Sequence, residues 1–275
     1  MENRRMSNRW KVLGIFLGIG MLILILGIDN KLTTVTYKID SDQIDHPVIV
    51  ALVSDFHSCD YGEGQEEIVN ALTLVDPDVV LLTGDIVDDH LGWENAEELL
   101  GIIASTYPCY YVSGNHEFWS GNIGGIKRMI ESYGVTILSG DEAIITMGTD
   151  RLQLLGVDDP DVGEGQWQRQ IRAVNESVEE DFYTILLSHR PERVETYSKM
   201  SVDLIVAGHA HGGQWRIPGL LNGLLAPDQG LFPKYAGGLY DLESNKMLVS
   251  RGLARETTRV PRLFNPPELV VVTIE

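Results

Sequence analysis

A repeating order of short apolar runs and amphipathic stretches is the feature of this sequence that most restricts its fold. Runs this short and apolar predict strands buried on both faces, and their alternation with helices predicts parallel pairing. The predicted strands lie at residues 47–55, 77–85, 109–116, 183–189 and 203–211. The predicted helices lie at residues 64–75, 95–105, 122–134 and 164–178.

The pattern changes after residue 137. Residues 142–157 alternate between apolar and polar, and Gly148-Thr149-Asp150 interrupts them as a hairpin turn would. Further strands are predicted at 213–217, 246–253 and 268–275, and we interpret this part as a second sheet that packs on the first. The expected fold class is α/β (α+β in some schemes): two packed mixed β-sheets flanked by helices, an αββα sandwich, preceded by one N-terminal transmembrane helix. A chain of 275 residues with 44% hydrophobic residues is long enough for one such core.

The N-terminal segment differs from the rest. Residues 1–11 hold four Lys/Arg and one acid, and residues 12–28 form a run of 17 residues without a charge, near the lower limit for a membrane span. A buried core helix rarely begins with four cations, and no small-residue cleavage site of a signal peptide follows. We therefore expect an uncleaved single-pass anchor in the cell membrane, with a cytoplasmic N-terminus and the rest of the chain outside the cytoplasm. The expected division is residues 1–31 for tail and anchor, 32–47 for a connector with an edge strand, and 48–275 for the main domain.

Charge and cysteine placement narrow the class further. Residues 1–31 hold five Lys/Arg and two Asp/Glu, so the other 244 residues hold 16 and 38, a formal charge of 16 − 38 = −22. A body this acidic repels phosphate backbones, so we expect no nucleic-acid partner. Cys59 follows the first predicted strand and Cys109 begins the third, which places them at opposite edges of a parallel sheet. We predict that no disulfide joins them.

Five of the predicted strands end in residues that can bind a metal ion. In open α/β sheets, ligands bind at the carboxyl ends of the strands, so we expect these five side chains to surround one crevice. They are Asp55, Asp85, Asn115, His189 and His209.

Short motifs around these residues add two more histidines. The sequences Asp55-Phe-His57 and His209-Ala-His211 each place two polar side chains on one side of an extended segment. A lone histidine at a strand end is more often structural than a ligand. Two on the same side, next to small residues, favour a ligand role.

The order of these motifs resembles that of the calcineurin-like metallophosphoesterase superfamily. The pattern is D-x-H, G-D-x-x-D, G-N-H-E, an isolated His in "SHRPE", and G-H-x-H. The motifs lie at residues 55–57, 84–88, 114–117, 189 and 208–211. The C-terminal part, including "GLFPKYAGGLY", resembles the membrane-anchored or exported bacterial subgroup.

The resemblance implies a centre of two divalent transition-metal ions. It implies that one ion is bound by Asp55, His57, Asp85 and His211, and the other by Asp85, Asn115, His189 and His209. It further implies that His116, next to Asp85 and Asn115 at the reacting centre, serves as general acid or binds a phosphoryl oxygen. Oxygen and imidazole ligands without thiolate suit Mn, our first expectation, and also Zn, Fe or Co.

The implied reaction is the hydrolysis of a phosphate ester. Two divalent ions can hold the phosphoryl group while a metal-bridging hydroxide attacks phosphorus. We expect a phosphodiesterase at the outer face of the membrane, with a substrate linked to lipid or cell envelope. The alternatives are a phosphomonoesterase or pyrophosphohydrolase on a lipid-linked or nucleotide-sugar substrate, and a non-catalytic metal-bearing scaffold. The oligomeric state is left open.

The sequence allows two interpretations for each of two residues and one segment. Asp88 either orients a histidine or caps a helix. Arg190 either binds substrate phosphate or forms a surface ion pair. Residues 213–235, rich in Leu, Trp and Phe, form either a lip that receives a lipid or a packed connection between strands.

Overall fold

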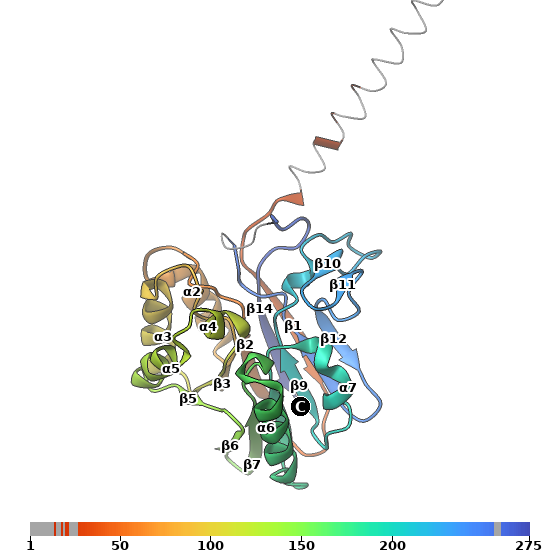
Figure 1. Cartoon of the computed structure of the whole chain (residues 1–275). Helices are drawn as coiled ribbons and strands as arrows, with labels where there is room; N and C mark the ends of the chain where they lie inside the picture. Colours follow the sequence, from red (N-terminus) through yellow and green to blue (C-terminus); the bar gives the residue numbers. More distant parts are fainter. Residues whose placement is uncertain (1–13, 15–17, 19, 22–26, 256–259) are drawn as a thin grey trace, which may run out of the picture.

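Two six-stranded sheets pack face to face, and helices cover their outer faces (Figure 1). The structure is a computed structural model that describes residues 14, 18, 20, 21, 27–255 and 260–275. The expected α/β architecture with two packed sheets is confirmed.

The first sheet has the order β1-β14-β2-β3-β4-β5. Strands β2 to β5 are parallel, β14 is antiparallel to β2, and β1 at the edge is parallel to β14. The bounds are β1 Thr33–Ile39, β14 Glu268–Ile274, β2 Val48–Val53, β3 Val79–Thr83, β4 Cys109–Val112 and β5 Thr136–Ile137.

The second sheet has the order β12-β13-β9-β8-β7-β6. Its four central strands are parallel, and β6 and β7 form the predicted hairpin, with Gly148 at φ 64° in the turn. The bounds are β12 Gly238–Asp241, β13 Lys246–Val249, β9 Leu204–Ala207, β8 Tyr183–Leu187, β7 Asp150–Gly156 and β6 Asp141–Met147. A small separate hairpin pairs β10 Leu225–Ala226 with β11 Gly230–Leu231.

The helices pack by their apolar faces. In α3, the buried residues Ala96, Leu99, Leu100 and Ile103 recur at helical spacing, so one face packs on the sheet. The four predicted helices are confirmed within two residues at each end. The helices are α2 Glu66–Val75, α3 Glu94–Thr106, α4 Asn115–Trp119, α5 Ile123–Ser132, α6 Glu164–Glu176 and α7 Val194–Tyr197. The 3₁₀ turns are η1 Glu63–Gln65, η2 Pro160–Val162, η3 Pro191–Arg193 and η4 His211–Gly213.

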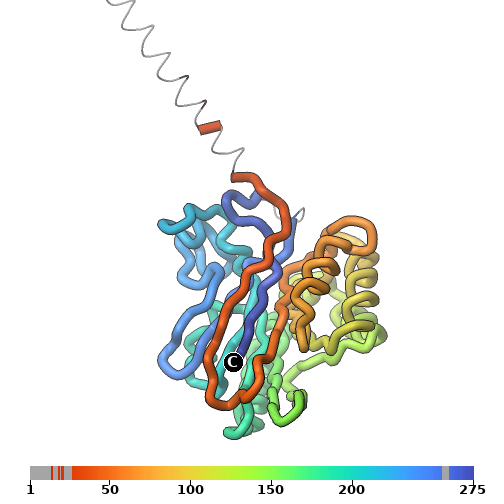
Figure 2. The backbone as a smooth tube through the Cα atoms, turned by 180° about the vertical axis from the view of Figure 1, so that it is seen from behind, coloured from red at the N-terminus to blue at the C-terminus, as the bar shows by residue number. Residues whose placement is uncertain are grey.

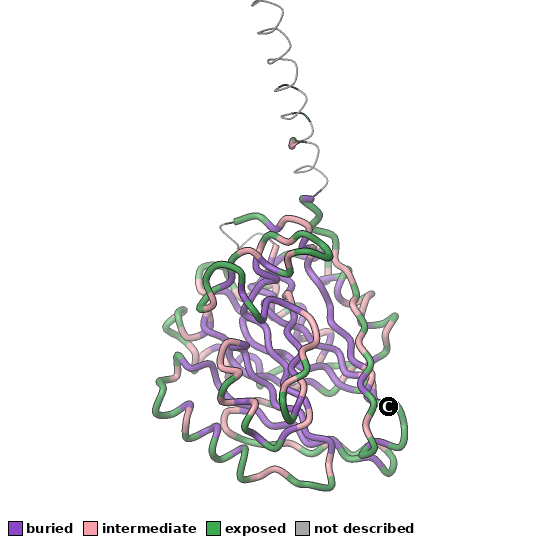
Figure 3. Tube along the Cα trace, turned by 90° about the vertical axis from the view of Figure 1, so that its right-hand side faces the viewer, coloured by how far each residue is buried: buried purple, intermediate pink, exposed green. Residues whose placement is uncertain are grey.

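The central strands have two apolar faces because each sheet lies between two layers. In β2, Val50 and Leu52 belong to the core between the sheets, whereas Ala51 and Val53 belong to the core under the helices. Side chains on a strand alternate between faces, so burial on both sides requires an uninterrupted apolar run. The buried strands form the interior in Figure 3.

Two predictions about the C-terminal third are wrong. Strand β14 lies in the first sheet between β1 and β2 rather than in the second, where its apolar run is covered on both faces. Residues 213–217 form no strand and only two isolated bridges, from Trp215 to Leu263 and from Ile217 to Leu221. The physical reason is the backbone at the start of the segment: Gly212, Gly213 and Gln214 all have positive φ angles, which turn the chain away from extended structure.

Most of the predicted membrane span, residues 12–28, lies outside the described residues. In the part of the chain that the structure describes, no helix has the length and apolar character needed to cross a membrane. Gly27, at the end of that run, is described, and its carbonyl accepts a hydrogen bond of 2.6 Å from the Phe264 amide. No disulfide joins Cys59 and Cys109, as predicted.

Candidate metal centre

Two groups of acidic and histidine side chains meet where strands of both sheets end. The ligand atoms of the first group all lie within 4.8 Å of one another, and so do those of the second. The first group is Asp55, His57, Asp85 and His211, and the second is Asp85, His189 and His209. Asp85 belongs to both groups, and each group draws on both sheets.

Asp85 lies at the centre of the arrangement. Its Oδ2 is 3.1 Å from His189 Nε2 and 3.6 Å from His57 Nε2. Its Oδ1 accepts a hydrogen bond of 2.9 Å from the backbone N–H of His116. That bond holds the start of α4, where the buried Asn115 is the first residue, beside Asp85. The structure therefore brings all seven residues predicted as ligands to one place.

Unpaired polar atoms at this place fit a metal ion. Buried polar groups in proteins nearly always have a hydrogen-bond partner. Within the described residues, five side-chain atoms of the group make no hydrogen bond of good geometry, although two of them, Asp85 Oδ2 and His189 Nε2, lie 3.1 Å apart as an ion pair. They are His57 Nε2, Asp85 Oδ2, Asn115 Oδ1, His189 Nε2 and His211 Nδ1. These are imidazole nitrogens, a carboxylate oxygen and an amide oxygen, the donors that divalent transition metals accept.

The backbone at the predicted ligands is strained. Non-glycine residues rarely adopt a positive φ, and holding one there costs about 1–3 kcal/mol. Five of the seven predicted ligands have such an angle, between 45° and 65°, and they are Asp55, His57, Asp85, His209 and His211. Strain concentrated on these residues is typical of a functional site, because ordinary loops would relax it.

Two glycines allow the strand ends to approach. A Cβ on Gly84, which has φ 86°, would lie 2.6 Å from His189 Nδ1 and 2.7 Å from the amide of Gly114. A Cβ on Gly208 would overlap Ser54 Oγ and Asp55 Oδ2. The carboxyl ends of β2 and β9 can therefore meet only because Gly208 has no side chain.

Hydrogen bonds on the far side of two imidazoles fix their orientation. His57 Nδ1 lies 3.1 Å from Asp88 Oδ2, and His189 Nδ1 donates to the carbonyl of Thr83 at 2.7 Å. Such partners set the tautomer, so that Nε2 is left for a metal. Asp88 therefore orients a histidine, which was one of its two interpretations. Its other oxygen accepts the amides of His90 and Leu91 in a turn and caps no helix.

His116 is placed beside the cluster by a carboxylate that the sequence analysis missed. Its Nδ1 is 2.6 Å from Asp89 Oδ1, and its ring lies edge-on to that of His57 at 4.3 Å between centroids. The ring of Trp119 lies against the His116 ring at 4.8 Å between centroids, and the His116 side chain is partly exposed. With Nδ1–H donating to Asp89, Nε2 is the nitrogen left to meet a substrate.

The expectation of a surface ion pair at Arg190 is wrong. Arg190 directly follows His189 at the end of β8, so it is buried in the wall of the site. It donates through Nε and Nη2 to the two oxygens of Asp159, at 2.6 and 3.1 Å, and through Nη1 to Asp228 Oδ2 at 2.5 Å. The same Asp228 oxygen lies 2.9 Å from His209 Nε2. Neither acid was predicted from the sequence, although Asp159 follows β7 as Asp85 follows β3.

Burial and neighbouring charges shift the pKa values of several groups at the centre. Burial opposes the charged form of His189, but the carboxylate of Asp85 outweighs it and raises the pKa of His189 to about 10. Burial lowers the pKa of His211 to about 3, so this imidazole is neutral and able to bind a metal. Burial and the nearby Asp85 raise the pKa of Glu117 to about 7. Glu117 accepts the backbone amides of Asp85, Ile86, Val87 and Gly114, which ties the second and third motifs together.

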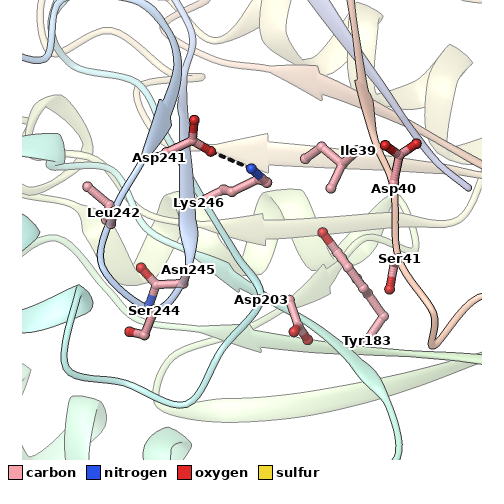
Figure 4. A pocket seen from close by; sticks show the side chains of 10 residues that line it. All are labelled: Ile39, Asp40, Ser41, Tyr183, Asp203, Asp241, Leu242, Ser244, Asn245 and Lys246. Atoms are coloured by element: carbon pink, nitrogen blue, oxygen red, sulfur yellow. Dashed lines mark hydrogen bonds and ion pairs between the residues drawn. The ribbon is translucent and has the colours of Figure 1, made fainter.

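A hollow at the other end of the second sheet, by the starts of its central strands, is separate from this centre. Figure 4 shows it between the start of β8, the start of β9 and the turn from β12 to β13, with a volume of about 280 Å³. Three acids, Asp40, Asp203 and Asp241, face it together with Lys246, which pairs with Asp241. An acidic hollow with one paired cation disfavours a phosphate ligand.

Comparison with known proteins identifies the family. A family model described as calcineurin-like phosphoesterase matches residues 49–213, which include every predicted ligand. The chain belongs to the calcineurin-like phosphoesterase family. The family membership predicted from the motif order is thereby confirmed, and the enzyme class, a phosphoester hydrolase, is supported by the same match.

Relatives extend the similarity beyond the matched domain. A metallophosphoesterase of Bacillus subtilis is 24% identical over 90% of this chain and 86% of its own length. One of Aquifex aeolicus is 30% identical over 72% of this chain and 73% of its own length. A phosphodiesterase of Escherichia coli is 28% identical over 64% of this chain and 63% of its own length.

Solved structures show the same fold at low identity. The NAD nucleotidase of Haemophilus influenzae aligns with a TM-score of 0.50 at 17% identity, covering 76% of this chain and 46% of that one. The phosphopantetheinyl hydrolase of Mycobacterium tuberculosis aligns with a TM-score of 0.50 at 12% identity, covering 80% of this chain and 96% of that one. This chain thus spans about half of the nucleotidase and nearly all of the hydrolase.

Proposed function

We propose that the chain is a phosphodiesterase that depends on two divalent metal ions. The observation that carries the proposal is the convergence of seven buried Asp, Asn and His side chains, five of which present an unpaired polar atom. We assign one ion to Asp55, His57, Asp85 and His211. We assign the other to Asp85, Asn115, His189 and His209, with Asp85 shared.

Bound divalent ions supply positive charge for the phosphoryl oxygens and lower the pKa of water at the centre. The chain contributes orientation and a proton. Asp88 and the Thr83 carbonyl hold the rings of His57 and His189, so their Nε2 atoms face the centre. We assign the protonation of the leaving oxygen to His116 Nε2, because Asp89 holds Nδ1. Arg190 is paired with two acids, so we assign it to positioning Asp228 and Asp159 rather than to substrate phosphate.

Diester rather than monoester specificity is supported by the Escherichia coli phosphodiesterase relative. Manganese is our first choice of metal, with Zn, Fe or Co as alternatives, because the ligands include no thiolate. Two alternatives remain, a phosphomonoesterase and a pyrophosphohydrolase that cleaves a phosphoanhydride, acting on a lipid-linked or nucleotide-sugar substrate, and both would use the same metal centre.

We further propose that residues 1–31 anchor the enzyme, and that residues 48–275 form the catalytic domain at the outer face of the membrane. Support comes from the sequence: four cations precede 17 uncharged residues. Residues 32–47 connect the two and contribute edge strand β1 to the first sheet.

The proposal is tested by turnover of the detergent-solubilised full chain on matched aryl phosphodiester and phosphomonoester substrates. The assay is run with Mn²⁺, with Zn²⁺ and with EDTA. We expect metal-dependent cleavage of the diester, and we expect His116→Ala to lower kcat by about 10²–10⁴-fold while metal content stays the same. Preference for the monoester would contradict the diester assignment. Absence of turnover at full metal occupancy would favour a metal-bearing scaffold.

A further inference from the structure

Residues 213–235 expose an unusual concentration of large apolar side chains. The described residues hold fourteen exposed large hydrophobic side chains, and six of them lie in this segment. We call these six the apolar rim: Trp215, Ile217, Leu220, Leu225, Leu231 and Phe232. Leu220 is 82% exposed, and Leu231 and Phe232 are each 66% exposed. Exposed apolar side chains gathered in one segment are typical of an interaction site, whereas single exposed apolar residues are common on any protein surface.

Hydrogen bonds hold the rim as one surface. The Leu224 amide bonds to the Gly213 carbonyl, the Phe232 amide to the Leu224 carbonyl, and the Arg216 amide to the Leu263 carbonyl. The indole N–H of Trp215 donates to the Pro261 carbonyl at 3.0 Å. Val260, next to Pro261, is a further exposed apolar residue beside the rim. The interpretation of residues 213–235 as only a packed connection does not explain why these side chains are exposed.

One rim residue is exposed at a cost in backbone energy. Phe232 has φ 58°, the left-handed region that bulky residues avoid. A strained aromatic that is two-thirds exposed contributes little to the core in return. Strain of this kind is typical of a residue held for an external contact.

The metal centre and the start of β1 lie at the same end of the molecule as the rim. Thr33, the first residue of β1, pairs with Glu268, the first of β14, and β14 runs antiparallel to β2. The chain therefore enters the fold at the edge where β2 ends in the site. Hairpin β10–β11 lies near this point of entry in both views (Figures 1 and 2).

The uncharged run of residues 12–28 indicates that a lipid bilayer covers the rim. The last two residues of the run are Gly27 and Ile28. The Gly27 carbonyl accepts a hydrogen bond from the Phe264 amide, and the carbonyl of the neighbouring Leu263 accepts one from the Arg216 amide in the rim segment. Ile28 is itself 53% exposed. A bilayer that accepted the run would therefore lie against the rim. Residues 213–235 hold two cations and one acid, a charge of +1, in a body of charge −22, so this surface avoids the repulsion from anionic lipid that the rest would feel.

The rim is joined to the metal centre by short connections. His211 begins turn η4, four residues before Trp215, and Asn265 Nδ2 donates to the carbonyls of His211 and Gln214. Asp228, in the hairpin of the rim, holds His209 and Arg190. A surface that rested on lipid would thus hold the metal centre close to the headgroups.

We propose that the apolar rim docks on the lipid bilayer and presents the metal centre to a phosphodiester carried by a lipid. The substrate class rests on the proposed function, whereas the docking surface does not. The chemistry recognised is an apolar chain anchored in the bilayer with a phosphodiester at headgroup depth.

The test uses the full chain reconstituted into vesicles of phosphatidylethanolamine and phosphatidylglycerol that contain a quencher lipid. An environment-sensitive fluorophore is attached at Leu220→Cys in the rim. The matched control is Leu74→Cys, which is 88% exposed near the end of α2, close to the start of β3 and so at the opposite edge of the sheet. We expect quenching of the label at position 220 and none at position 74. Equal signals at the two positions would overturn the docking surface.

A double variant, Leu231→Asp with Phe232→Asp, separates the rim from the N-terminal anchor. Aspartate tolerates a positive φ better than phenylalanine, so this variant should fold. We expect it to abolish the quenching at position 220. We also expect turnover of a vesicle-borne phosphodiester to fall about tenfold or more, because two large apolar side chains leave the interface, while turnover of a soluble aryl phosphodiester is unchanged. Leu74→Asp should change neither rate.

The remaining outcomes distinguish the two proposals. Quenching that persists in the double variant would assign membrane contact to the anchor alone and overturn the rim. Quenching with cleavage of the soluble diester but not of the vesicle-borne one would overturn the lipid substrate. Quenching without cleavage of either would support the rim and contradict the proposed function.

Discussion

At the scale of single residues, the site depends on carboxylates that hold histidines from behind. Asp88 holds His57, Asp89 holds His116, and Asp228 holds His209. Each pair joins an imidazole to a side chain from a loop, so ring orientation is set before any ligand arrives. These three acids lie behind the histidines, whereas Asp55 and Asp85 lie among the proposed ligands, where bound divalent ions would offset their charge and allow an anion to bind.

The first prediction concerns the partner of His57. Asp88→Asn removes a charge and weakens the bond to His57 Nδ1, so we expect metal affinity to fall about 10–100-fold with little change in fold. Equilibrium dialysis with Mn²⁺ measures it. Asp42→Asn, an exposed acid remote from the site, is the control and should bind as the wild type does. Equal affinity in the two variants would show that Asp88 does not support the ligand.

The second prediction concerns proton release. With the pKa of His189 raised to about 10, the metal-free protein holds this imidazole protonated at neutral pH. A metal ion must displace that proton, so metal binding becomes stronger as the pH rises, until the pH exceeds the pKa of His189. We expect the apparent affinity to rise about tenfold per pH unit between about pH 7 and 9. Calorimetry in buffers of different ionisation enthalpy counts the protons released when the metal binds. As a control, His46→Gln, which changes a histidine remote from the site, should leave the slope of metal affinity against pH unchanged. A pH-independent affinity would contradict the assignment of His189.

At the scale of elements, the centre exists because loops from two sheets approach closely. The third prediction tests that approach. Gly208→Ala would place a Cβ against Ser54 and Asp55, so the loops after β2 and β9 must separate. We expect a loss of about 1–3 kcal/mol in the free energy of unfolding, together with loss of metal binding. Gly165→Ala, on α6, is the control and should be neutral or stabilising, because the added Cβ would meet only Arg169 Nη1 at 3.8 Å, an ordinary contact. Chemical denaturation with metal titration decides, and a stable, metal-binding G208A would show that the loops can adapt.

The elements also show how far the sequence could predict the structure. Continuous apolar runs predicted the buried strands because each sheet is covered on both faces. Strand ends predicted five of the seven clustered residues, because parallel strands share an end of the sheet, and the short motifs added His57 and His211. The place of β14 was not predictable from its own residues, because an apolar run fits the interior of either sheet. Asp89 and Asp228 were missed because their contacts are made by loops far apart in the chain, which leave no periodicity.

At the scale of the whole molecule, the proposed ligands join the two halves of the sandwich. Asp55, Asp85 and Asn115 follow strands of the first sheet, and His189, His209 and His211 follow strands of the second. The core between the sheets holds the halves along the strands. Bound metal would hold the two sheets together at the carboxyl ends of their strands, where buried polar groups replace the apolar core. Metal binding should therefore raise the free energy of unfolding of the whole protein.

The fourth prediction follows from that link. A ligand at about 1,000 times its Kd stabilises a protein by about 4 kcal/mol, and for a chain of this size each kcal/mol shifts Tm by about 2–4 °C. We therefore expect EDTA to lower Tm by about 10 °C in differential scanning calorimetry. Asp85→Asn, which weakens the ligand shared by both groups, should lose most of this EDTA effect. Asp42→Asn should keep it. A Tm that is independent of EDTA in the wild type would mean that no metal joins the sheets, and that the unpaired atoms of the five side chains are satisfied in another way.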